Sequence, residues 1–80
     1  MTVEWPTLRR VIAVALDLSE RRITMTAKAG DPAEWDSLMH MLLMLELEKV
    51  FEVRLTKEDF DHLTSAEIIL GWLNEDRQAS

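Results

Sequence analysis

Few residues of this chain have side chains suited to chemistry. None of the 80 residues is cysteine, and the two histidines are His40 and His62. Without cysteine there is no thiol nucleophile, no thiolate metal site and no disulfide. Two histidines on separate expected helices cannot supply a nucleophile, its base and an orienting group. We predict that the protein is not an enzyme and that it has no metal site.

One hydroxyl group, that of Ser37, lies where it could be chemically modified. The segment Trp35-Asp36-Ser37-Leu38 leads into an apolar run, which predicts that Ser37 begins a helix. Unpaired backbone N–H groups and the helix dipole favour an anion such as a phosphodiester at this end. Ser37 could therefore carry a phosphate-linked group. A helix cap is the simpler role for either polar residue, and the two roles are compatible because Asp36 can cap while Ser37 is modified.

The elements that must position Ser37 are predicted to be helices. Glycine and proline number two each, tyrosine is absent and no alternating apolar pattern is present. We expect one all-α domain over residues 1–80, with a long structured loop over residues 18–35 and a short third helix. That loop is expected to be anchored by Ile23, Met25 and Trp35. The expected helices begin near Pro6 or Thr7, Ser37, Thr56 and Thr64 and end near Asp17, Phe51, Leu63 and Leu73.

Helical periodicity predicts which side chains form the core. The expected inward residues are Leu8, Val11, Ile12, Ala15 and Leu16 in the first helix, His40, Leu43, Met44, Leu47, Val50 and Phe51 in the second, Phe60 and Leu63 in the third, and Ile68, Ile69, Trp72 and Leu73 in the fourth. Thr56 with Asp59, and Thr64 with Glu67, have the spacing of capping boxes.

The second helix also has an apolar stripe on its opposite side, formed by Leu38, Met41, Leu42 and Leu45. A helix in a small bundle usually buries one apolar face, so we predict that this second stripe is exposed and binds a partner. The alternative is that the long loop covers the stripe.

Together these features resemble the acyl carrier protein family, which attaches 4'-phosphopantetheine from coenzyme A to the serine of an Asp-Ser-Leu motif. The family spacing runs without gaps through nearly the whole chain: Leu16, Leu18, Ile23, the motif, Leu43, Leu47, Phe51, Thr56, Leu63 and Thr64-Ser65. The Trp-Asp-Ser-Leu form is similar to free-standing carriers of specialised pathways. The resemblance implies a small four-helix bundle of acyl-carrier type that carries a thioester-linked intermediate on an arm at Ser37.

The resemblance also implies the partners. A phosphopantetheinyl transferase would read Asp36 and Leu38, with Asp36 close to the metal that this enzyme brings. The docking residues would be Leu38, Met41, Leu42, Leu45, Glu46 and Glu48. An acyl- or aminoacyl-loading ligase and downstream transferases of fatty acid or polyketide type would follow. The residues do not distinguish an acyl from an aminoacyl cargo.

The chain departs from the family pattern next to the motif and on the docking helix. Glu34 stands where a glycine is usual, and the bulky Trp35 adjoins the motif. Leu42 replaces a common acidic residue, and with Lys49 it makes the docking face more apolar and less acidic. Partners with an apolar groove are favoured over the general fatty-acid machinery.

Several large side chains near the motif have more than one interpretation. His40 falls on the core side of its helix and is predicted to be packed or partly buried, without a nearby partner in the sequence. Trp35 is either a staple beside the helix start or a surface for the arm. Met39, Met41 and Met44 could form a flexible acyl pocket or simply pack.

Charge and hydropathy limit the partners. The formal net charge is -6 and the pI is about 4.7, which disfavours binding to nucleic acid and to anionic lipid. No apolar run approaches the length of a membrane span, and no signal peptide is recognisable. We expect a cytoplasmic monomer. The competing hypothesis is a small helical adaptor that binds a partner through the apolar stripe while Ser37 stays unmodified.

Overall fold

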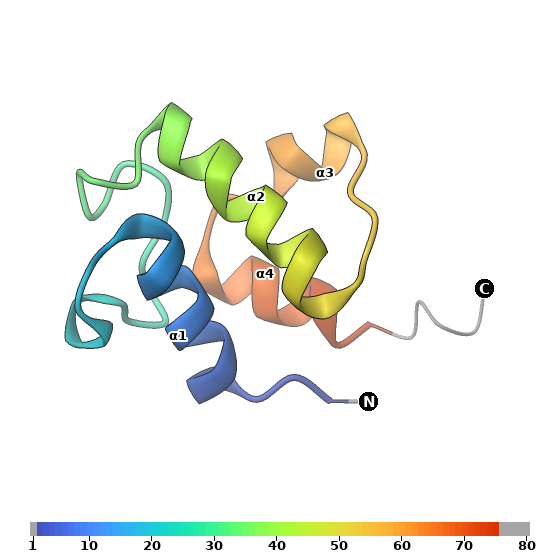
Figure 1. Cartoon of the computed structure of the whole chain (residues 1–80), viewed down its shortest axis with the longest axis horizontal. Helices are drawn as coiled ribbons and strands as arrows, with labels where there is room; N and C mark the ends of the chain where they lie inside the picture. The colour runs from blue at the N-terminus through green and yellow to red at the C-terminus, as the bar shows by residue number, and fades with distance from the viewer. Residues whose placement is uncertain (1, 76–80) are drawn as a thin grey trace.

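The computed structural model describes residues 2–75 and is all-α, as predicted (Figure 1). These residues form four α-helices. The long loop between the first and second α-helices contains one short 3-10 helix. The third α-helix is short, also as predicted. Their bounds are α1 Trp5–Leu16, η1 Glu20–Arg22, α2 Ser37–Phe51, α3 Lys57–His62 and α4 Ala66–Leu73.

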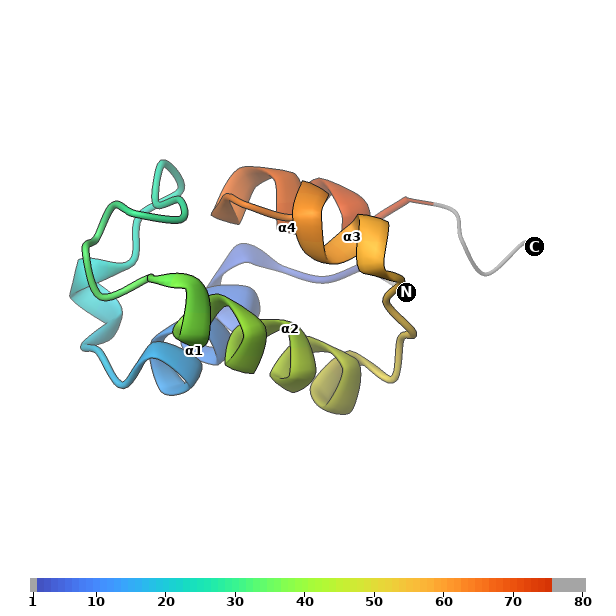
Figure 2. The same ribbon diagram turned by 90° about the horizontal axis from the view of Figure 1, so that it is seen from above.

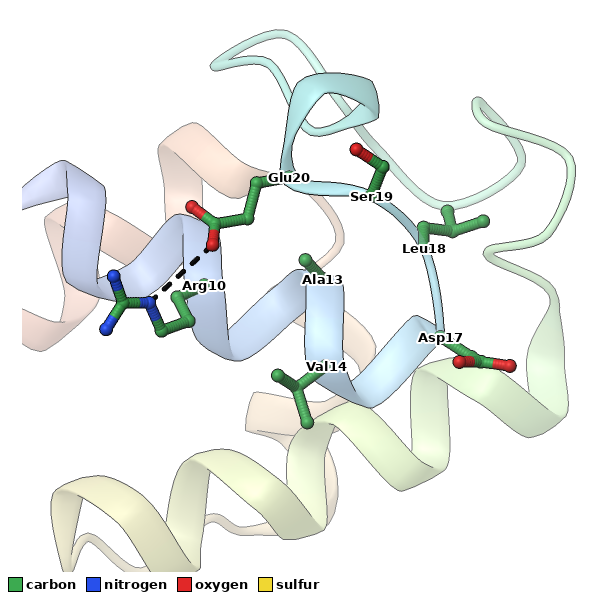
Figure 3. Close-up of a pocket in the computed structure, with 7 residues that line it drawn as sticks. All are labelled: Arg10, Ala13, Val14, Asp17, Leu18, Ser19 and Glu20. Atoms are coloured by element: carbon green, nitrogen blue, oxygen red, sulfur yellow. Dashed lines mark ion pairs between the residues drawn. The ribbon is translucent and has the colours of Figure 1, made fainter.

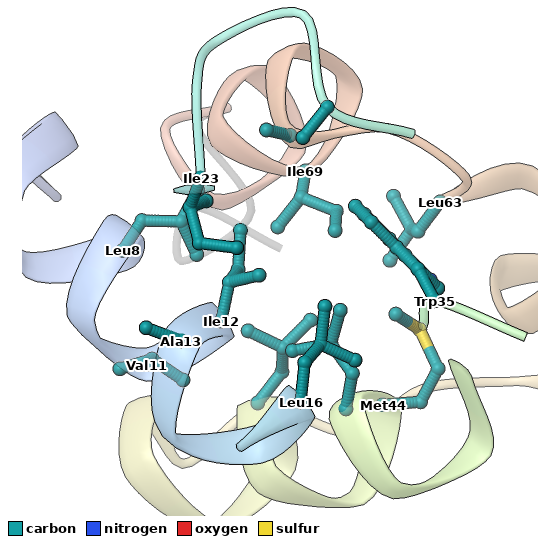
Figure 4. Packing of buried hydrophobic residues seen from close by; sticks show 14 of the residues in the cluster. Leu8, Val11, Ile12, Ala13, Leu16, Ile23, Trp35, Met44, Leu63 and Ile69 are labelled. Atoms are coloured by element: carbon teal, nitrogen blue, oxygen red, sulfur yellow. The ribbon is translucent and has the colours of Figure 1, made fainter. Parts of the chain in front are cut away.

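The helices form two layers. Figure 2 shows α1 and α2 side by side in one layer and α3 and α4 in the other, with the loop between α1 and α2 closing one end. The core lies between the layers and includes residues from α1, α2, α4 and the first loop (Figure 4). No helix in residues 2–75 is long and apolar enough to cross a membrane.

Helix α1 begins at Trp5, one or two residues before the predicted start at Pro6 or Thr7, and Pro6 lies in its first turn, where a missing N–H is harmless. It ends at Leu16, and its C-cap Asp17 has a left-handed conformation with φ of 57°. Leu8, Val11, Ile12 and Leu16 are buried as predicted. Ala13 is also buried, whereas the predicted core residue Ala15 is only partly buried.

The bounds of α2 are those predicted from the sequence. Leu43, Met44 and Leu47 are fully buried in the core. The prediction for Val50 is wrong, because its side chain is 43% exposed. At 100° per residue, Val50 lies about 60° from the centre of the buried face, in the last turn of the helix.

The first loop is anchored by buried Ile23, Ala27 and Trp35. The prediction that Met25 is an anchor is wrong. The N–H of Ala27 donates to the carbonyl of Thr24 over 3.0 Å, so Met25 occupies the outer side of a turn and is exposed.

The loop also determines where α4 begins. The N–H of Ala29 donates to the carbonyl of Thr64 (2.8 Å), and the N–H of Ala66 donates to the carbonyl of Ala27 (2.9 Å). This pairing holds the chain extended through Ser65. The helix is therefore capped by Ser65, whose hydroxyl accepts from the N–H of Ile68, and the predicted start at Thr64 is wrong.

The remaining predictions for α3 and α4 have a mixed outcome. The capping box of Thr56 and Asp59 is confirmed, with both reciprocal hydrogen bonds present. Leu63, Ile69 and Trp72 are buried as predicted. Ile68 is exposed, because Ala66, Ile69 and Trp72 form the buried face of α4 and Ile68 lies about 100° around the helix from Ile69.

Candidate functional site

Ser37 is the first residue of α2, and its side chain is exposed. Of the two residues that could cap this helix, Asp36 is the N-cap: its Oδ1 accepts from the N–H of Met39 over 2.9 Å, and its carbonyl accepts from the N–H of His40 over 2.8 Å. Because Asp36 performs the capping, the hydroxyl of Ser37 is not needed for it. The helix geometry leaves the N–H groups of Ser37 and Leu38 without intrahelical acceptors.

This arrangement fits a phosphodiester-linked group on Ser37. The exposed hydroxyl stands at the positive end of a helix of 15 residues, where a negatively charged phosphate is stabilised by the dipole and the free N–H groups. A flexible arm attached there needs no cavity at its point of attachment. Asp36, Ser37 and Leu38 are all exposed, so a modifying enzyme can reach the whole motif.

The exposed apolar stripe of α2 begins at the same helix end. Leu38, Met41, Leu42 and Leu45 are between 43% and 63% exposed, so the alternative in which the long loop covers them is wrong. We call these four residues the α2 stripe. Glu46 lies beside the stripe and is half-buried. Glu48 is also half-buried, and its Oε2 accepts from the N–H of Leu55 over 2.9 Å, so it stabilises the turn after α2.

Trp35 is fully buried, which rules out the interpretation as a surface for the arm. Its ring stacks on the ring of His40, with centroids 6.1 Å apart and an angle of 26° between the planes. Trp35 precedes the N-cap and His40 is the fourth residue of the helix, so the pair occupies the positions of a staple. Figure 4 shows Trp35 in the core beside Leu63 and Met44.

His40 is partly buried, as predicted, but it has two partners that its sequence neighbourhood did not reveal. Its Nδ1 lies 3.0 Å from Nε1 of Trp35, and its Nε2 lies 2.8 Å from the carbonyl oxygen of Phe60. The second partner is 20 residues away in the sequence. Only the packing of α3 against the start of α2 brings this carbonyl within reach.

The three methionines near the motif do not share one environment. Met44 is fully buried, Met39 is half-buried and Met41 is 52% exposed as part of the α2 stripe. They therefore do not line a common pocket. The packing interpretation holds for Met44.

Glu34, which stands where a glycine was expected, forms an ion pair with Arg22. Nη1 and Nη2 of Arg22 donate to Oε2 and Oε1 of Glu34 over 2.8 and 2.9 Å. These hydrogen bonds lower the pKa of Glu34 and raise the pKa of Arg22. Both side chains are exposed to solvent, so the pair closes the loop without a large gain in stability. The sequence holds no local signal for this pairing.

A hollow of about 580 Å³ lies between the end of α1 and η1 (Figure 3). It is lined by Arg10, Ala13, Val14, Asp17, Leu18, Ser19 and Glu20. Nε of Arg10 lies 3.6 Å from a carboxylate oxygen of Glu20, so these two charges partly neutralise each other. Ser37 does not line this hollow, and we assign it no chemistry.

The candidate site is thus the exposed motif Asp36-Ser37-Leu38 and the α2 stripe that continues from it along the same helix. The structure brings the predicted attachment residues and the predicted apolar docking residues together on one element. A comparison of the chain with protein-family models found no match.

Proposed function

We propose that this chain is a carrier protein that bears a thioester-linked acyl or aminoacyl intermediate on a 4'-phosphopantetheine arm at Ser37. One observation carries the proposal: Ser37 is an exposed hydroxyl at the first residue of a long helix whose cap is supplied by Asp36, and the α2 stripe leads away from it. The resemblance to acyl carrier proteins gives the identity of the arm. The proposal includes a cytoplasmic monomer served by a loading ligase and downstream transferases of a specialised pathway.

In this proposal the chain presents groups and performs no catalysis. Oγ of Ser37 would form a bond to the phosphorus atom that carries the pantetheine of coenzyme A, and adenosine bisphosphate would leave. The hydroxyl proton of Ser37 would pass to a base of the transferase. The N-terminal dipole of α2 would stabilise the phosphodiester after transfer. The α2 stripe would contact an apolar groove of the transferase and of later partners.

The first test is an intact-mass measurement after incubation with coenzyme A, magnesium and a broad-specificity phosphopantetheinyl transferase. We expect one phosphopantetheine adduct per chain. Trypsin should then release residues 29–49, in which Ser37 is the only hydroxyl-bearing residue. An adduct on this peptide would identify the attachment site without a variant. An unmodified chain, under conditions that fully modify a known carrier, would contradict the proposal.

A second test concerns the α2 stripe. Met41→Glu places a charge in the exposed stripe, and we expect it to raise the KM of the transferase for this chain about tenfold or more, the usual scale for disrupting an apolar contact. The melting temperature should hardly change, because surface substitutions usually shift stability by less than about 0.5 kcal/mol.

Val50→Glu is the matched control for Met41→Glu. Val50 is an apolar residue of the same helix with 43% exposure, against 52% for Met41. It lies about 120° around the helix from Leu38 and outside the α2 stripe. Transferase kinetics should be unchanged in this variant. Equal effects of the two substitutions would show that a general loss of apolar surface, rather than the stripe, is responsible.

The exposure of the α2 stripe also favours a second candidate function. Four large apolar side chains on one helix face suit a partner helix whether or not Ser37 is modified. A small adaptor is therefore the alternative. It predicts no adduct in the intact-mass measurement, together with loss of partner binding in Met41→Glu.

A further inference from the structure

One side chain connects the start of α2 to two other parts of the chain. Nδ1 of His40 accepts from the indole N–H of Trp35 (3.0 Å), and Nε2 lies 2.8 Å from the carbonyl oxygen of Phe60. An indole N–H can only donate and a carbonyl can only accept. The geometry therefore requires a neutral imidazole with its proton on Nε2, donating to Phe60.

Trp35 gains a buried hydrogen bond from this arrangement. The ring is fully buried, and a buried indole N–H without an acceptor is costly. Nδ1 of His40 supplies that acceptor, and the rings also stack. The loop residue before Asp36 is therefore held to the first turn of α2 by a directed bond as well as by packing.

The carbonyl oxygen of Phe60, near the end of α3, gains a hydrogen-bond donor from His40. This carbonyl lies in the last turn, where helix geometry supplies no N–H, and the N–H of Thr64, four residues on, donates instead to the carbonyl of His62 over 2.8 Å. Helix α3 has only six residues and cannot be stable on its own hydrogen bonds. Its first turn is closed by the capping box of Thr56 and Asp59, and His40 serves its last turn.

The position of these bonds matters for Ser37. Trp35 lies two residues before Ser37 and His40 lies three residues after it, so the bond between them fixes the chain on both sides of the hydroxyl. We infer that His40, through its neutral Nε2–H tautomer, is a positioning residue that holds Ser37 in the orientation in which it meets the transferase. This inference rests on the proposed carrier function.

Alignment of the Ser37 hydroxyl and docking of the α2 stripe should affect different kinetic constants of the transferase reaction. The α2 stripe is made by residues of α2 alone, so docking should survive when the link to Trp35 is lost. The hydroxyl would then spend less time aligned with its target phosphorus, and small misplacements of reacting groups are costly. We therefore expect substitutions of His40 to lower kcat of the transferase reaction, whereas Met41→Glu raises KM.

Three variants of His40 show whether the bond to Trp35 or the bond to Phe60 positions Ser37. His40→Leu removes both bonds and should lower kcat about tenfold, on the scale of a modest misalignment. His40→Asn places an amide oxygen near the position of Nδ1 and should recover most of kcat. His40→Gln places an amide N–H near the position of Nε2 and should not. All rates are measured well below the melting temperature of each variant, which circular dichroism provides.

Trp35→Phe tests the same bond from its other end, because it keeps an aromatic ring and removes the indole N–H. It should lower kcat to the level of His40→Leu. The double variant Trp35→Phe/His40→Leu should be no worse than the more affected single variant, since each substitution already removes the bond between Trp35 and His40. Multiplicative effects in the double variant would overturn a shared positioning bond.

A spectroscopic measurement tests the bond without the transferase. The indole N–H signal of Trp35 is identified in ¹H–¹⁵N spectra as the one missing in Trp35→Phe. It should shift and exchange faster with water in His40→Leu and stay near its wild-type position in His40→Asn. Long-range ¹⁵N spectra should show His40 with its proton on Nε2.

The outcomes distinguish this inference from the proposed function. An unchanged indole signal in His40→Leu would overturn the bond itself. An altered signal with unchanged kcat would overturn the positioning role while the carrier function stands. A wild-type chain that takes no arm would overturn the carrier function, and the positioning role with it, even if the spectra show the bond.

Discussion

Replacing Ser37 with alanine is expected to abolish the phosphopantetheine adduct completely and to leave the fold intact. The adduct requires the hydroxyl oxygen, which alanine lacks. Stability should change by less than about 0.5 kcal/mol, because Ser37 is exposed, Asp36 supplies the cap and alanine favours helices. Intact mass after transferase treatment and thermal melting by circular dichroism measure the two effects on the same sample.

Two other serines are controls for Ser37→Ala. Ser19 is exposed and caps η1, so Ser19→Ala should keep the full adduct. Ser65 caps α4, so Ser65→Ala should also keep the adduct but lose about 1 kcal/mol of stability. Unfolding of Ser37→Ala would show a structural serine, and an adduct that persists in it would move the attachment site elsewhere.

Replacing Trp35 with alanine is expected to have the largest effect on stability. Truncating a fully buried tryptophan usually costs about 3–5 kcal/mol, through lost burial and the cavity that remains. It also leaves Nδ1 of His40 without its donor and removes an anchor of the first loop. A domain of this size has a total stability of only a few kcal/mol, so we expect a largely unfolded chain at 25 °C.

Urea denaturation followed by far-UV circular dichroism measures this effect. Trp5→Ala is the matched control, because Trp5 lies in the first turn of α1 and is only partly buried. It should cost clearly less than Trp35→Ala. A cost of under about 1 kcal/mol for Trp35→Ala would be well below the usual cost of core truncation. It would show that Trp35 does not anchor the loop.

The sequence alone predicted the features that depend on neighbouring residues. The bounds of α2, a polar cap at Asp36 or Ser37, and the capping box at Thr56 all came from short-range patterns. The exposure of the α2 stripe followed from a helix with two apolar faces, of which a small bundle buries one. The candidate site was therefore predicted from the sequence, because a helix start and one helix face are local properties.

The tertiary structure decided the features that depend on residues far apart in the sequence. Pairing with Ala27 and Ala29 keeps the chain extended through Ser65, so α4 begins at Ala66. The bonds from His40 to Trp35 and Phe60 were not predicted, because nothing in the order of residues indicates that the end of α3 lies beside the start of α2. Periodicity indicates which side of a helix is apolar, whereas hydrogen-bond partners across the core depend on how the elements pack.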